Sequence, residues 1–118
     1  MLRTNPGPAL GRPVIPRPER SPAALRAACA VVAPRSSRPY GRAKDQALDE
    51  AVERGSLAPV HAWLAHWAAL IEIERHPEAA KRYRHAVYPA RIATAPEEAR
   101  EHLTTASALY REAASGAA

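Results

Sequence analysis

The segment 56–80 has the clearest hydrophobic pattern in the chain. Plotted at about 100° per residue, its large apolar side chains fall in one stripe, and alanines occupy most of the opposite side. This pattern predicts a central helix that is capped by Ser56, ends near Arg75 and packs the other helices on its apolar face. The stripe contains Leu57, Val60, Trp63, Leu64, Trp67, Leu70 and Ile71.

Prolines mark the starts of the other helices, because a proline in the first helical turn gives up no hydrogen bond. Pro22, Pro39 and Pro77 each follow a polar or loop residue and begin a run with helical spacing of apolar residues. Besides the central helix, the sequence predicts helices over residues 22–33, 39–54, 77 onward and about 95–114.

Three signals predict where these helices end or begin. Gly55 is the expected left-handed cap at the end of the second helix. Pro89 should kink or end the fourth helix, since it lacks an N–H group. Thr94 and Glu97 have the spacing of a capping box at the start of the fifth.

Short connections between these segments favour helices that pack roughly antiparallel to their neighbours. There is no strand pattern, internal repeat or glycine-rich loop in the sequence. We therefore predict an all-α protein, a compact bundle of four to five helices that forms a single domain over residues 21–115. The predicted core consists of Leu25, Val32, Leu48, Val60, Trp63, Leu64, Trp67, Ile71, Tyr83, Val87 and Leu103.

The first 20 residues differ from this domain in composition. Their prolines interrupt every helical or alternating pattern, which predicts a disordered, partly polyproline-II tail over residues 1–20. Of the net charge of +5, residues 1–42 carry +7, from eight arginines and one glutamate, and the rest of the chain carries −2. A solvated extension and a contact for an acidic partner both fit this tail.

The same prolines exclude a secretory signal, and no stretch approaches the roughly 18 apolar residues of a membrane span. The single cysteine, Cys29, cannot form an internal disulfide, which agrees with a reducing compartment. We expect a cytoplasmic protein. Cys29 also lies in an apolar stripe with Leu25 and Val32, where burial would remove the thiolate that a nucleophile requires.

The histidines do not have the spacing of a metal site. His61 and His66 are five residues apart and point about 140° away from each other on a helix. Glu72 with His76 is spaced i, i+4, whereas di-iron bundles use an i, i+3 pair together with further glutamates. A helix-surface ion pair is the expected role, and we predict no catalytic residue, no cofactor and no metal.

Glu74 is an acidic residue inside the apolar stripe of the central helix. A buried carboxylate without a partner is costly, so either the stripe emerges into solvent there or an arginine of another helix pairs with it. We favour the structural ion pair.

One stripe on the fourth helix has the character of a binding surface, because basic residues surround an exposed tyrosine opposite the Tyr83 and Val87 face. Arginine binds phosphates and carboxylates through paired hydrogen bonds, and tyrosine can pack on a partner. An acidic protein and nucleic acid are the two partner classes that fit, beside the alternative of a simply solvated face. The predicted partner-binding residues are Lys81, Arg84, His85, Tyr88 and Arg91.

The Pro/Arg-rich start, SPAALRAACAVVAP at 21–34 and GSLAPVHAWLAHWAALIEIERHPEAAKR at 55–82 together resemble a family of small actinobacterial proteins, a domain of unknown function of the 6247 type. The resemblance covers about residues 13–82 and, loosely, the last helix. It implies a bacterial cytoplasmic setting, and it carries no known catalytic or ligand residue. Some members are encoded beside small toxins of the ribonuclease-fold type, which implies an antitoxin or accessory partner.

Taken together, the sequence predicts a non-catalytic protein-interaction or regulatory module, in its most specific form the antitoxin or accessory partner of a small toxin. The alternative is a nucleic-acid-binding transcriptional regulator that uses the basic helix face. A homo-oligomer also fits, because alanine dominates the apolar residues and the core is thin.

Overall fold

The computed structural model describes residues 10–92 and 95–117, without the side chains of residues 89–92 and 117. These described residues contain five α-helices, one short 3-10 helix and no strand, which confirms the predicted all-α fold. The elements are α1 (Pro22–Val32), the 3-10 helix η1 (Pro34–Ser36), α2 (Ser37–Arg54), α3 (Ala58–Glu74), α4 (Pro77–Ile92) and α5 (Pro96–Ala117).

Most helix boundaries follow the proline and glycine signals. As predicted, α1 and α4 begin at Pro22 and Pro77. The Ser21 hydroxyl oxygen accepts a hydrogen bond from the backbone N–H of Ala24 and so caps α1. Gly55 ends α2 in the left-handed conformation, with φ 62° and ψ 37°, which confirms the predicted C-terminal cap.

The signals near the end of α4 were less informative. Of the two outcomes predicted for Pro89, a helix end is wrong, because α4 continues to Ile92. A proline removes only its own bond to the carbonyl four residues earlier, and that loss in the last turn leaves the rest of the helix intact. The capping box predicted at Thr94 lies outside the described residues, and α5 begins at Pro96.

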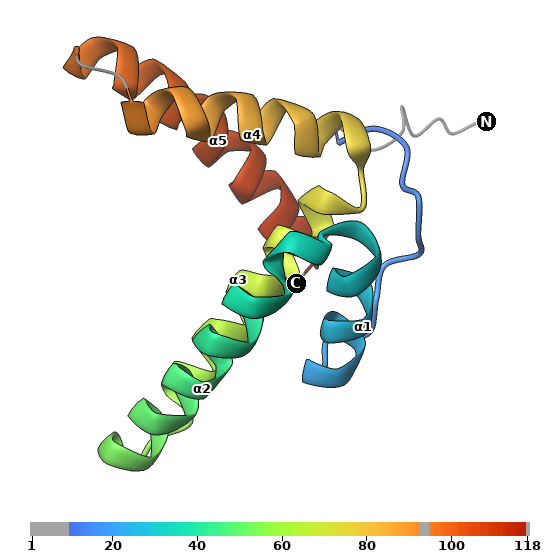
Figure 1. The fold of residues 1–118 in the computed structure, drawn as a ribbon, viewed down its shortest axis with the longest axis vertical. Coiled ribbons are helices and arrows are strands. Elements are labelled where there is room, and N and C mark those ends of the chain that lie inside the picture. Colours follow the sequence, from blue (N-terminus) through green and yellow to red (C-terminus); the bar gives the residue numbers. More distant parts are fainter. Residues whose placement is uncertain (1–9, 93–94, 118) are drawn as a thin grey trace.

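The helices form two hairpins that diverge from a common junction (Figure 1). One hairpin consists of α2 and α3, and the other of α4 and α5. α1 packs beside the first hairpin, while the C-terminal part of α5 returns to contact α3 near the junction. The predicted bundle is therefore built from two hairpins with different axes, and α3 takes part in both packing arrangements.

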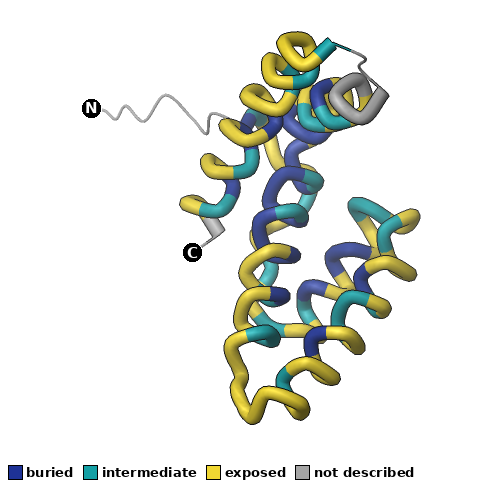
Figure 2. The backbone as a smooth tube through the Cα atoms, turned by 90° about the vertical axis from the view of Figure 1, so that its left-hand side faces the viewer, coloured by how far each residue is buried: buried dark blue, intermediate teal, exposed yellow. Residues whose placement is uncertain are grey.

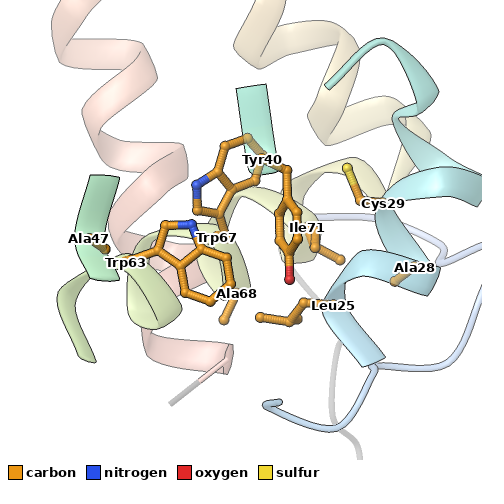
Figure 3. Packing of buried hydrophobic residues seen from close by; sticks show 9 residues of the cluster. All are labelled: Leu25, Ala28, Cys29, Tyr40, Ala47, Trp63, Trp67, Ala68 and Ile71. Carbon is orange, nitrogen blue, oxygen red and sulfur yellow. The ribbon is translucent and has the colours of Figure 1, made fainter. Parts of the chain in front are cut away.

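A core of aromatic and aliphatic side chains joins α1 to the α2–α3 hairpin (Figure 3). Tyr40 lies between two tryptophans, with ring centroids 5.0 Å from Trp63 and 5.2 Å from Trp67. Its hydroxyl donates a 2.6 Å hydrogen bond to the carbonyl oxygen of Pro22, which satisfies the polar end of a buried ring. Leu25 and Ile71 close this core, so the predicted role of α3 as the helix on which α1 and α2 pack is confirmed.

A second, smaller core lies where the two hairpins meet. It contains Ile73 of α3, two alanines at the start of α4, and Leu109 and Ala113 of α5, together with Leu10 from the N-terminal segment. Ala79 and Ala113 have no exposed surface, because small side chains allow the helix backbones to approach closely. The alanine side of α3 is correspondingly covered at Ala69 and open to solvent at Ala62.

Two predicted core residues are exposed. Leu48 keeps 46% of its surface in solvent, whereas its neighbour Ala47 is buried in the first core. Leu103 is 51% exposed and lines a groove formed only by residues of α4 and α5. The burial pattern in Figure 2 shows the same gradient, with buried positions at the centre and exposed ones at the hairpin ends.

The other predicted core residues are at least partly covered. Val32 and Leu64 pack against the first core and Tyr83 against the second. Val60 and Val87 are also half-buried. Leu25, Trp63, Trp67 and Ile71 are fully buried, as predicted.

Residues 10–20, which we call the strap, correct the predicted boundary between tail and domain. Residues 1–9 lie outside the described part, but the strap runs along the junction toward α1 (Figure 1). Leu10 is buried in the second core and Ile15 packs against the first. The Val14 N–H also donates to the carbonyl of Arg75 at 2.8 Å. Prolines hold this segment extended, and its apolar residues anchor it at intervals that have no helical or strand period.

Candidate partner-binding cleft

A cleft of about 540 Å³ lies between the end of α1 with η1, the middle of α3, and α4. We call it the binding cleft, because it contains two of the predicted partner-binding residues, Arg84 and Tyr88. Its walls and floor are formed by Cys29, Ala33, Ser36, His66, Trp67, Leu70, Ile71, Glu74, Tyr83, Arg84, Val87 and Tyr88. The site is thus a mainly apolar hollow with a few ionisable groups at its edge.

The floor of the cleft is the outer surface of the first core. Trp67 and Ile71 are almost fully buried, and Cys29 lies beside them with its thiol 3.5 Å from the carbonyl oxygen of Ala33. Burial raises the pKa of the Cys29 thiol, because the thiolate would lose its hydration. Cys29 is therefore a packing residue, as predicted from its place in the apolar stripe of α1.

Glu74 and Arg84 form an ion pair across the mouth of the cleft. Arg84 Nη1 donates to Glu74 Oε1 at 3.0 Å and to Oε2 at 3.3 Å. This arrangement confirms the predicted pairing of Glu74 with an arginine of another helix. The Arg84 side chain remains 60% exposed, so most of its guanidinium group still faces solvent at the cleft edge.

The remaining predicted partner-binding residues lie around this edge. Tyr88 is 65% exposed and lines the cleft, one helical turn beyond Arg84. Lys81 and His85 are also exposed on α4 but do not line the cleft. The side chain of Arg91 lies outside the described residues. The structure therefore brings Arg84 and Tyr88 together with apolar floor residues that the sequence analysis had assigned only to the core.

His66 connects the cleft to a second groove between α4 and α5. Its Nδ1 and the hydroxyl of Tyr110 are 2.8 Å apart, and the two rings lie 5.6 Å apart between centroids. Partial desolvation lowers the pKa of His66, which stays exposed, and raises the pKa of Tyr110, so the neutral form of each is favoured. The adjoining groove, of about 630 Å³, shares Tyr83 and Val87 with the cleft.

Basic residues are common on the elements that flank the cleft, although Arg84 is the only arginine or lysine among its lining residues. Residues 20–36, which include α1 and η1, contain three arginines and no acidic residue. α4 contains four arginines or lysines, with Glu78 as its single acid. Because Arg84 is paired with Glu74, the charges of these two lining residues offset each other, and the cleft is a mainly apolar hollow flanked by arginines of α1, η1 and α4.

The pair Glu72 and His76 is not the surface ion pair that the spacing suggested. Glu72 is only 3% exposed, and its carboxylate accepts hydrogen bonds from Arg17 of the strap and from Arg75. His76 is also buried and bonds through Nδ1 to the backbone oxygen of Glu72, at 2.7 Å. Among the described residues, no three His, Cys, Asp or Glu side chains are grouped closely enough to hold a metal ion.

The chain matches a family described as a family of unknown function (DUF6247) over residues 13–115. The chain belongs to this family. The DUF6247 match begins at Pro13, inside the strap, and thus includes Ile15, which packs against the first core. No curated protein and no solved structure matches the chain. None of the described helices of this DUF6247 member has the length and apolar character needed to cross a membrane.

Proposed function

We propose that this DUF6247 protein is a non-catalytic interaction module whose binding cleft receives an acidic segment of a partner protein. The observation that carries the proposal is the combination of a mainly apolar cleft with exposed Arg84 and Tyr88 at its edge and further arginines on the helices that flank it. An amphipathic segment with acidic residues beside an apolar stripe would match both features. Arg84 and Tyr88 are of the residue types that most often dominate such contacts.

In its most specific form, the partner is a small toxin and the protein is its antitoxin or accessory protein. Neutralisation would follow from covering the toxin surface with the cleft and α4. The proposal places the interaction in the cytoplasm, where the single cysteine would remain reduced.

Co-expression with the product of the adjacent gene, followed by size-exclusion chromatography, tests this proposal. The two proteins should co-elute, and Tyr88→Ala or Arg84→Glu should weaken the complex at least about tenfold. Arg100→Glu serves as the matched control, because Arg100 is an exposed arginine of α5 that does not line the cleft. Separate elution of the two proteins, or equal weakening by the control, would contradict the proposal.

The alternative function is nucleic-acid binding by the same basic residues, which the uninterrupted positive charge of residues 20–44 favours. Binding of this kind should weaken steeply with salt, because each phosphate contact releases counterions. A gel-shift titration of duplex DNA at two salt concentrations, with wild type and with Arg84→Ala, separates the two functions. A shift that is absent or insensitive to salt would remove this alternative.

A further inference from the structure

The outward face of α2 carries a row of exposed residues that continues from η1 to the last turn of the helix. Successive members are alternately three and four residues apart, a spacing that keeps them on one side of a helix. They lie opposite Tyr40 and Ala47, the residues through which α2 packs on the first core. We call this row the α2 stripe. Its members are Arg35, Arg38, Arg42, Asp45, Asp49 and Val52, all exposed.

The charges of the α2 stripe change sign once along the helix. Its first three members are arginines, the next two are aspartates, and Glu53 adjoins the last. A helix dipole favours acids near the N-terminus and bases near the C-terminus, so this order opposes the dipole. Arg38 and Arg42 also repel each other, since they lie one helical turn apart. The stability of α2 itself therefore does not explain the arrangement.

The charged groups of the α2 stripe have no partner inside the molecule. Among the described residues, no ion pair or side-chain hydrogen bond joins any of them to another residue. The stripe also does not line the binding cleft, so its charges are separate from the pair of Glu74 and Arg84. A partner that satisfies both halves of the stripe has to present acids to the arginines and bases to the aspartates.

A second copy of the same stripe has this order of charges when it runs antiparallel. With a two-fold axis between positions 42 and 45, each arginine of one copy faces an acidic residue of the other. The axis repeats every contact, so both halves of both stripes are satisfied at once. The facing pairs are Arg42 with Asp45, Arg38 with Asp49, and Arg35 with Val52 and the adjoining Glu53.

We infer that the protein forms a two-fold homodimer through antiparallel contact between the α2 stripes of two copies. Val52, which is 84% exposed, packs on the aliphatic stem of Arg35 of the second copy. Exposed ion pairs contribute little individually, so the dimer is weak and depends on ionic strength. Nucleic acid fits this surface less well, because its phosphates would meet the aspartates of the same stripe. The inference does not rest on the proposed function, since Arg84 and Tyr88 lie outside the stripe.

Sedimentation equilibrium of the full-length chain, over a range of concentrations, tests the dimer. At low salt the weight-average mass should rise above the monomer value of 12.8 kDa. Raising the salt from about 50 mM to about 500 mM should weaken association at least about tenfold, because it screens the ion pairs. Circular dichroism of the wild type and of every variant verifies the helical fold.

Charge reversal locates the interface. The double variant Arg38→Glu, Arg42→Glu should weaken association at least about tenfold, because each half of the contact then brings like charges together. The double variant Arg26→Glu, Arg54→Glu is the matched control. It makes the same change in net charge at two exposed arginines outside the stripe, and it should leave association unchanged.

A rescue experiment tests the antiparallel pairing. The double variant Asp45→Arg, Asp49→Arg should also weaken association, since its stripe is basic at both ends. Combining these changes with Arg38→Glu and Arg42→Glu in one chain reverses the order of charges. This fourfold variant should form the homodimer again, because its stripe remains self-complementary about the same axis, whereas a parallel pairing would place like charges together.

Four results would overturn the inference. One is a monomer at every concentration in low salt, and another is equal weakening by the control. The third is a fourfold variant that stays monomeric although it is folded. The fourth is a monomeric chain that shifts duplex DNA, with a shift that arginine reversal abolishes and Asp45→Arg, Asp49→Arg strengthens, since this pattern assigns the stripe to nucleic acid. None of these outcomes affects capture of a partner protein through Tyr88, so the proposed function is tested separately.

Discussion

Arg17 and Glu72 lie 55 residues apart in sequence and form a paired ion contact. Arg17 Nε donates to one carboxylate oxygen and Nη2 to the other, each at 2.9 Å. Arg75 donates to the same two oxygens at 2.9 and 3.0 Å, so two guanidinium groups hold one buried carboxylate. Arg75 Nη1 also donates to the Ile15 carbonyl, at 3.0 Å. These bonds attach the strap to the end of α3.

Replacing Glu72 by glutamine should destabilise the protein strongly. The change leaves Arg75, which is buried, without its carboxylate, and breaking a buried pair from one side costs about 3–5 kcal/mol. Urea unfolding followed by circular dichroism measures the loss. Glu74→Gln is the matched control, because its partner Arg84 is mostly exposed, and the expected cost is below about 1 kcal/mol. Equal losses for the two variants would contradict this assignment.

The contrast between these two glutamates shows what the sequence could and could not predict. The pairing of Glu74 was predictable, because the carboxylate lies in the apolar stripe of its own helix and arginines follow on the next one. The partner of Glu72 was not, because Arg17 lies in an extended segment without periodicity and meets α3 only through the tertiary fold. For the same reason, the strap was assigned to a tail.

The loss of folding stability at acidic pH should depend mainly on the protonation of Glu72. Burial alone would raise the pKa of Glu72, but the hydrogen bonds and charges of Arg17 and Arg75 outweigh it and lower the pKa from 4.5 to about 2. A carboxyl group with a lowered folded-state pKa contributes its stability above the unfolded value, and this contribution is lost as the pH falls from about 4.5 toward 2. Thermal midpoints measured over that range should therefore fall more steeply for wild type than for Glu72→Gln. Parallel curves would show that Glu72 is not the group responsible.

Gly41 inside α2 and Gly55 at its C-terminal cap should respond in opposite ways to the same substitution. Gly55 has a φ of 62°, a conformation that alanine adopts at a cost of about 1 kcal/mol, and no atom lies within 4 Å of a Cβ placed there. Gly41 lies inside the helix, also with free space, so Gly41→Ala should stabilise by about 0.5–1 kcal/mol. Urea unfolding of Gly55→Ala and Gly41→Ala tests both signs. A stabilising Gly55→Ala would exclude the left-handed cap.

Alanine substitutions in the predicted core should separate into two classes. Leu25 is 1% exposed between α2 and α3, and Leu25→Ala should cost about 2–5 kcal/mol. Leu48→Ala removes a side chain that is half in solvent, so the expected cost is below about 1 kcal/mol. Denaturant midpoints measure the difference. A large cost at Leu48 would mean that its side chain is covered in solution.

Helical periodicity placed all of these leucines on inward-facing stripes, yet it cannot state how far each stripe is covered. That depends on the lengths and crossing of neighbouring helices. α1 is shorter than the hairpin on which it packs, and α5 extends past α3. Leu48 and Leu103 are therefore exposed to solvent, although each lies on the apolar side of an amphipathic helix. The binding cleft has the same origin. Its residues belong to α1, η1, α3 and α4, and only the divergence of the two hairpins brings them to one hollow.

His66 should titrate below its ordinary pKa of 6.5, because partial desolvation beside Trp67 and Tyr110 disfavours its charged form although the residue stays exposed. The unfolded chain then binds more protons than the folded one just below pH 6.5, so this residue makes stability fall as the pH falls through that window. NMR titration of the His66 ring protons measures the pKa directly. Since desolvation is the cause, Tyr110→Phe, which removes the hydroxyl but keeps the ring, should leave the pKa below 6.5. A return to 6.5 in that variant would show that the hydrogen bond to Tyr110, and not burial at the edge of the cleft, sets the charge of His66.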